Sequence, residues 1–207
     1  MANKREKALR EKENILKKYQ WQLKKILPLY IVAAVVGASA LLCYFFAFAA
    51  VDNSAYGIEV KVSGFAFAIA ALTGKYSSTD KIYGDIAVPF NYYAEAETAA
   101  VGTLALVSIV ALVAAIALTI VTRVTKKQEI NFAAVICSAV CLITTALAFF
   151  TALSMKNAEI LSVYCGGNPK CSIVSFAFVA IIVETAFLAI QIISAIKFIK
   201  LKINNKN

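Results

Sequence analysis

TAAVGTLALVSIVALVAAIALTIVT, residues 98–122, decides the fold class of this chain. These 25 residues carry no charge, and a helix of about 20 apolar residues is enough to cross the hydrocarbon core of a bilayer. Three further apolar runs lie at 26–51, 130–155 and 172–196, and the last of them is interrupted by one charged residue, Glu184. The sequence therefore predicts an all-α membrane protein, a bundle of four transmembrane helices.

The composition also indicates a membrane protein. Hydrophobic residues make up 61% of the 207 residues, whereas soluble domains contain about 45–50%. The net charge of +9 could suggest nucleic-acid binding, but the charges lie at the two ends and in one short loop, outside the uncharged runs. This distribution is typical of membrane topology and argues against nucleic acid as a partner.

The apolar runs divide the chain into nine segments, and the shortest loop forces its two flanking spans to lie antiparallel and adjacent. In chain order the segments are a basic amphipathic segment (1–25), the first span (26–51), an outer lobe (52–97), the second span (98–122), a basic loop (123–129), the third span (130–155), a second outer loop (156–171), the fourth span (172–196) and a basic tail (197–207).

The distribution of Lys and Arg predicts the orientation. The segments 1–25, 123–129 and 197–207 together hold 16 of them, whereas the two remaining loops hold 5. Cytoplasmic segments carry the excess of positive charge. We therefore expect a multi-pass protein of the cell membrane with both termini in the cytoplasm and with the lobe outside.

The first 25 residues predict a basic amphipathic helix on the cytoplasmic membrane surface. Apolar and aromatic residues recur there every three to four positions. We expect the neighbouring lysines to contact anionic lipid headgroups, namely Lys17, Lys18, Lys24 and Lys25. The alternative is a solvated charged tail that only sets orientation. Pro28 predicts a break or kink before the first span.

Small residues predict the inward faces of the spans, because lipid removes the hydrophobic drive between helices and close packing must replace it. These residues are Ala33 and Gly37 in the first span, Ser108, Ala111, Ala115 and Thr119 in the second, and Ala133, Cys137, Cys141, Thr145, Ala148 and Ala152 in the third. We interpret Cys137 and Cys141 as packing residues, since a metal site would need further ligands and histidine is absent.

Glu184 lies about halfway along the fourth apolar run, where an ionised carboxylate costs about 2.5–3.5 kcal/mol. It should therefore face the interior, either paired or protonated. Gln191 and Ser194 continue a thin polar seam on the same helix. One interpretation is a proton or cation relay, or a contact with a partner helix. The other is a protonated carboxyl group hydrogen-bonded to hydroxyls of the other spans.

The outer lobe, 52–97, contains a predicted β-hairpin. Large apolar residues alternate with polar or small ones on both sides of Ser63-Gly64. A two-residue turn there would place six of them on one face: Ile58, Val60, Val62, Phe65, Phe67 and Ile69. The alternative is a short helix or re-entrant segment over 64–74. Two strands alone are marginal in water, so the lobe must rest on the second outer loop, the membrane or another protein.

Aromatic residues of the lobe predict a contact surface, because tyrosine presents a large area with few rotatable bonds. Five of the nine tyrosines lie in this segment. The predicted contact residues are Tyr56, Phe65, Phe67, Tyr76, Tyr83, Tyr92 and Tyr93.

The second outer loop predicts a disulfide between Cys165 and Cys171. Gly-Gly and Asn-Pro lie between them and are strong turn signals, which would bring the two sulfur atoms together on the oxidising side of the membrane. Two free thiols are the alternative.

The overall plan resembles the claudin-type arrangement in length and topology: four spans, both ends inside, a long first outer loop and a short second one. The tryptophans and cysteine pair of that family's first loop are missing here, so the resemblance implies no residue roles.

Three function classes follow. We expect a non-enzymatic interaction or accessory protein that binds a protein partner or a second copy of itself through the lobe and the helix faces. The alternative is a subunit of a small transporter or channel centred on Glu184. A membrane enzyme is disfavoured, because the sequence has no histidine and no visible nucleophile–base pair, and we expect no cofactor or metal.

Overall fold

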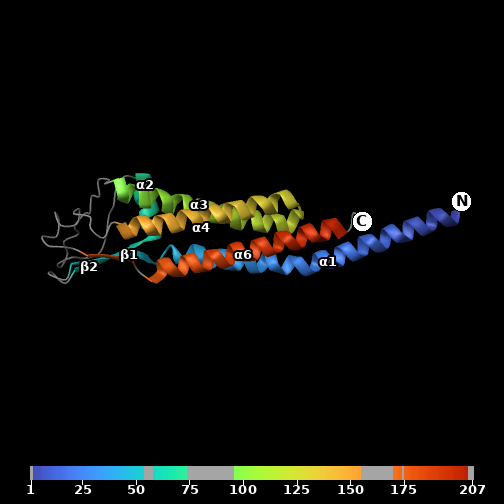
Figure 1. The fold of residues 1–207 in the computed structure, drawn as a ribbon, viewed down its shortest axis with the longest axis horizontal. Coiled ribbons are helices and arrows are strands. Elements are labelled where there is room, and N and C mark those ends of the chain that lie inside the picture. The colour runs from blue at the N-terminus through green and yellow to red at the C-terminus, as the bar shows by residue number, and fades with distance from the viewer. Residues whose placement is uncertain (1, 54–57, 74–95, 155–169, 174, 205–207) are drawn as a thin grey trace.

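The computed structural model describes residues 2–53, 58–73, 96–154, 170–173 and 175–204 (Figure 1). Within them, four long helices run side by side, and a small three-stranded sheet lies at one end of the bundle.

The prediction of four long apolar helices is confirmed, and each of them contains a stretch that is long and apolar enough to cross a membrane. The helices are α1 (Ala2–Cys43), α3 (Ala96–Thr125), α4 (Gln128–Ser154) and α6 (Ser175–Asn204). The apolar stretches are Lys24–Cys43, Ala100–Thr125, Glu129–Thr151 and Ala177–Lys200.

The first helix differs from the prediction at both ends. It continues through Pro28 without a break and extends far past the other three helices at its N-terminus (Figure 1). Transmembrane helices tolerate proline, because neighbouring groups satisfy the backbone that it frees. At the other end α1 stops at Cys43, and i→i+3 bonds tighten the turn that follows. Residues 47–51, predicted as part of the span, belong to a strand.

That strand, β1 (Ala47–Asn53), is central in the sheet, whose order is β2-β1-β3. Strand β2 (Ile58–Ser63) pairs antiparallel with one side of β1, and β3 (Lys170–Ile173) pairs antiparallel with the other. The two loops predicted to lie outside the membrane therefore share one sheet. A central strand has two paired edges and can be as apolar as a span. The absence of charged residues therefore could not show where the first helix ends.

The predicted hairpin with its turn at Ser63-Gly64 is wrong, and the short-helix alternative is the structure found. Helix α2 (Gly64–Thr73) begins at that point. The Ser63 hydroxyl accepts a hydrogen bond from the backbone N–H of Ala66 at 3.1 Å, which caps the helix. The alternating alanines also favour helix, since alanine has the highest helix propensity.

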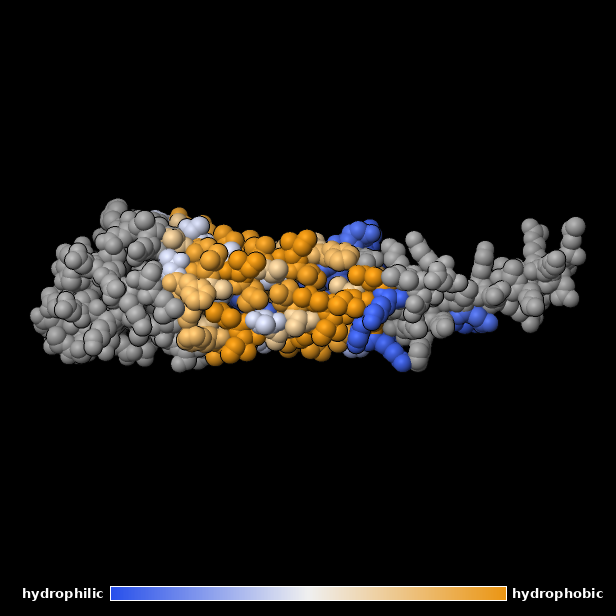
Figure 2. All heavy atoms as spheres, in the orientation of Figure 1, coloured by the Kyte–Doolittle hydropathy of each residue, from blue (hydrophilic) through white to orange (hydrophobic). Residues whose placement is uncertain are grey.

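Close packing joins the helices as a ring, in which α1 contacts α3 and α6, and α4 contacts the same two helices. The inward faces carry the predicted small residues, and burial confirms Ala33, Ser108, Ala115, Thr119, Cys141, Thr145 and Ala148. Large apolar side chains point outward, and on the face that Figure 2 shows they form a predominantly apolar band along the bundle. Basic residues border this band at the end from which α1 extends (Figure 2).

Two glycines permit the closest helix approaches. A Cβ atom on Gly37 would lie 2.8 Å from Cγ1 of Ile116 and 3.0 Å from the ring of Phe187, which are on α3 and α6. A Cβ atom on Gly102 would lie 2.7 Å from the backbone oxygen of Phe67, so α2 rests directly on α3. Both contacts are too short for a larger residue without movement.

Candidate functional site

Glu184 lies inside the bundle with 1% of its surface exposed, eight residues into the apolar stretch of α6. Its Oε1 atom accepts a hydrogen bond from the Tyr44 hydroxyl at 2.8 Å and one from the Thr145 hydroxyl at 3.1 Å. The two hydroxyl oxygens are themselves 2.6 Å apart. These three side chains form the outer polar cluster, which joins α4 and α6 to the turn that follows α1.

The surroundings of Glu184 hold no charge that could pair with a carboxylate among the described residues. Its further neighbours are the Cys141 side chain on α4 and Cys43 at the end of α1. Thr145 can also donate to the backbone oxygen of Cys141 at 2.9 Å. An unpaired carboxylate is costly inside a membrane, so these surroundings favour the protonated form of the carboxyl group.

Tyr44 connects this cluster to the lobe. The residue is fully buried, and its ring stacks on Phe48 of β1 with the ring centres 5.2 Å apart. Its backbone oxygen accepts a hydrogen bond from the N–H of Phe65, at the start of α2, at 3.0 Å. A Cβ atom on Gly64 would lie 2.8 Å from the Tyr44 ring. One side chain therefore contacts the polar interior, the sheet and the short helix.

A second polar contact, the inner polar pair, lies seven residues further along α6. Gln191 is 2% exposed and donates from Nε2 to the Thr119 hydroxyl on α3 at 2.8 Å, and Thr119 donates to the backbone oxygen of Ala115. Helices α3 and α6 are not among the closely packed pairs, so this bond crosses the bundle. Ser194 is buried but donates to its own helix, to the backbone oxygen of Ile190.

An apolar layer separates the two polar levels. Phe187 lies between Glu184 and Gln191 in sequence on the buried face of α6, and it packs where Gly37 of α1 meets Ile116 of α3. The polar seam predicted from α6 is thus divided into two levels, because an aromatic side chain occupies the intervening turn.

Four buried polar atoms have no hydrogen-bond partner among the described residues. They are Oε2 of Glu184, Oε1 of Gln191, Nδ2 of Asn131 and the hydroxyl oxygen of Tyr30. A buried polar group without a partner costs about 1–3 kcal/mol. In the part of the chain that the structure describes, no three histidine, cysteine or acidic side chains gather as metal ligands.

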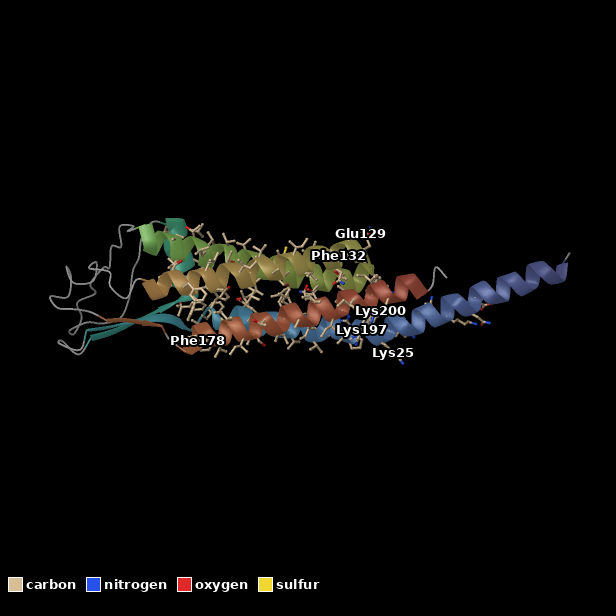
Figure 3. All side chains as sticks on the ribbon, in the orientation of Figure 1. Lys25, Glu129, Phe132, Phe178, Lys197 and Lys200 are labelled. Atoms are coloured by element: carbon tan, nitrogen blue, oxygen red, sulfur yellow. The ribbon has the colours of Figure 1, made fainter. Side chains whose placement is uncertain are left out.

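The basic residues of α1 and α6 that flank the apolar stretches lie at one end of the bundle. Lys25 of α1 and Lys197 and Lys200 of α6 all lie toward the end from which α1 extends, whereas Phe178 lies toward the opposite end (Figure 3). Lys24 is exposed at the same level of α1 as Lys25. Further out on α1, Lys17 forms an ion pair with Glu13 at 3.0 Å, and Lys18 lies within the same helix.

Several predicted contact residues are placed differently from the expectation. Phe67 is buried against α3, because α2 is a helix and turns this residue inward. Phe65 is half-buried and stacks on Phe45, with ring centres 4.3 Å apart. The tyrosines of the predicted surface and Cys165 lie outside the described residues: Tyr56, Tyr76, Tyr83, Tyr92 and Tyr93. Cys171 lies in β3 opposite Val51, and the predicted disulfide stays a prediction.

Tyr44 is the residue that sequence reasoning missed. A tyrosine close to the end of an apolar run is typical of a side chain at the membrane interface, so it drew no attention. The only available signal was the need of a buried carboxyl group for hydroxyl partners. This need predicted hydroxyl groups as the partners of Glu184, but it did not indicate which hydroxyls of the other three spans they are.

A scan of protein-family models finds no match to this chain, and a search of curated proteins finds none either.

Proposed function

We propose that this chain is a non-enzymatic accessory protein of the cell membrane whose outer lobe binds a protein partner. One observation carries the proposal: the described part of the lobe is anchored to the bundle. Tyr44 links the sheet and α2 to the buried carboxyl group, and α2 rests on α3 at Gly102. A pre-organised surface binds at a lower entropic cost than a loose loop, so anchoring suits a recognition role.

The test is co-purification of the cross-linked chain at native expression. Gly102→Val should displace α2 from α3 and reduce partner recovery at least severalfold, because its Cβ would meet the Phe67 backbone. Ala117→Val is the matched control, since Ala117 is exposed on the same helix. A partner at constant stoichiometry supports the proposal, and equal recovery of the partner with both variants contradicts a role for the lobe.

The proposal includes an orientation with both termini in the cytoplasm. The basic residues at one end of the bundle support it, since cytoplasmic segments are rich in Lys and Arg. A cysteine-labelling scan tests it: an impermeant thiol reagent applied outside cells should label Asp80→Cys and leave Lys126→Cys unlabelled. The reverse pattern would overturn the orientation.

The same basic end supports anionic lipid headgroups as partners. Each lysine near an anionic surface contributes about 1 kcal/mol. Replacing Lys24, Lys25, Lys197 and Lys200 with glutamine should remove most of the anionic lipid that stays bound in native mass spectrometry. Unchanged lipid retention would argue for lysines that only set orientation.

A subunit of a small transporter or channel is the second candidate, and the buried polar atoms without partners favour it. Intramembrane polar groups often mark ion or proton paths. Proton flux into vesicles that contain the purified protein should then be abolished by Glu184→Gln while insertion is retained. Absence of any flux with the native chain would remove this candidate.

A further inference from the structure

The two oxygens of the Glu184 carboxyl group have different surroundings. Oε1 lies within hydrogen-bond distance of the Tyr44 and Thr145 hydroxyls, whereas Oε2 is buried and has no hydrogen-bond partner among the described residues. The single Thr145 hydrogen can be donated to Oε1 or to the backbone oxygen of Cys141, whereas the Tyr44 hydroxyl donates to Oε1. When Oε1 accepts in this way, the proton of a neutral carboxyl group lies on Oε2. The atom that carries the proton is therefore the atom that the cluster leaves free.

A purely structural role would favour a different arrangement. A protonated glutamic acid that only joins helices gains most when its O–H finds an acceptor, because a buried donor without one costs free energy. Here the hydroxyls face Oε1, one of the two oxygens that share the negative charge after the proton leaves. Hydrogen bonds to a charged acceptor are about twice as strong as neutral ones, so the cluster is arranged to stabilise the anion as well as the acid.

Tyr44 connects the charge state of Glu184 to the position of the outer lobe. Its hydroxyl contacts Glu184, while its ring and backbone hold Phe48 and Phe65 of the lobe. The titratable groups that face Glu184 from the surrounding described elements are Tyr44 itself, Cys43 and Cys141, and none of them is a cation. Loss of the proton thus strengthens the Tyr44 contact without a competing ion pair.

We propose that Glu184 is a reversible proton-binding site whose charge sets how tightly Tyr44 holds the outer lobe on the bundle. The step is a proton transfer from Oε2 to a water molecule, which leaves a carboxylate held by the Tyr44 and Thr145 hydroxyls. The lobe is held less tightly in the protonated form and more tightly in the deprotonated form. This proposal requires no protein partner and no net transport, so it stands or falls independently of the proposed function.

Infrared spectroscopy of the chain in lipid vesicles tests the proton site. In a titration from acidic to alkaline pH, the native chain should lose a carboxylic-acid carbonyl band as the pH rises. Glu184→Gln should lack this band at every pH. Thr185→Val is the control, because Thr185 is exposed on the same helix, and it should titrate like the native chain. A band that persists unchanged through the range, or no band at all, overturns the proposal.

Tyr44→Phe keeps both the ring and the carboxyl group, so it tests the site even where Glu184→Gln fails to insert. Loss of a hydroxyl donor to the anion should shift the titration midpoint upward by about one pH unit, a tenfold gain in proton affinity. An unchanged midpoint would show that Tyr44 does not stabilise the carboxylate.

Hydrogen exchange tests the connection to the lobe. The N–H of Phe65 bonds to the Tyr44 backbone oxygen, so it reports how firmly the lobe is held. After correction for the intrinsic pH dependence, its exchange should slow severalfold as Glu184 loses its proton, and this change should vanish in Glu184→Gln. The same corrected profile in both chains would refute the connection.

Discussion

Glu184 and Gln191 have side chains of the same length and lie seven residues apart on the buried face of α6, but they make different hydrogen bonds. Glu184 is bound by two hydroxyls and reaches the lobe through Tyr44, whereas Gln191 makes one bond across the bundle to Thr119. One level holds an ionisable group next to the sheet, and the other holds a neutral amide deeper in the bundle. The comparison teaches that an apolar layer can divide the polar groups of one bundle into separate hydrogen-bonded levels.

The largest effect should come from disturbing the layer that separates the two levels. Gly37→Val would drive a side chain into Ile116 and Phe187, and overpacking of this kind costs about 3 kcal/mol. The free energy of unfolding in mixed detergent micelles measures it. Ala38→Val, on the exposed face of the same helix, is the matched control and should change little. Equal stabilities of the two variants would mean that the layer is loosely packed.

Removing the Tyr44 hydroxyl should have the next largest effect. Tyr44→Phe keeps the ring stacked on Phe48 but deprives Glu184 of a donor, which should cost about 1.5 kcal/mol. The same unfolding titration gives the value. Limited proteolysis of the lobe should also become faster, since the outer cluster holds it. A stability loss without any change at the lobe would confine the role of Tyr44 to the bundle.

A smaller effect should follow from breaking the inner pair. Thr119→Val leaves Nε2 of Gln191 without its partner, and hydrogen bonds between membrane helices average about 0.6 kcal/mol. Proteolysis of the lobe should stay at the native rate, because the hydrogen bonds of the Thr119 hydroxyl are to Gln191 and to the backbone of its own helix. Faster proteolysis of the lobe would show that the two levels are coupled across the apolar layer.

The four spans and their inward faces could be predicted from the sequence, because about 20 apolar residues and a stripe of small side chains leave few alternatives in a bilayer. The end of α1 could not, since the first five residues of the central strand β1, 47–51, are as free of charge as the span before them. The start of α2 depended on a local cap at Ser63, which competes with a turn at the same two residues.

The candidate site could be predicted in part. A lone carboxyl group in an apolar run must face the interior, so the burial of Glu184 followed from its position alone. Its partners did not, because Thr145 is 39 residues away and Tyr44 is 140 residues away in the chain. Only the way in which the helices pack selects these two hydroxyls from the many that the spans contain.

The smallest effect on stability should come from Glu184→Gln, which makes the two levels of α6 chemically alike. The amide oxygen of glutamine can accept from Tyr44 and Thr145 as Oε1 does, so the free energy of unfolding at neutral pH should change by no more than about 0.5 kcal/mol. The variant has no proton to lose at this level, so any pH dependence of lobe proteolysis that Glu184 causes should disappear. A loss much larger than that of Thr119→Val would indicate that the amide group does not fit where the free Oε2 atom lies. The chemistry of the outer level would then depend on the shape of the acid as well as on its proton.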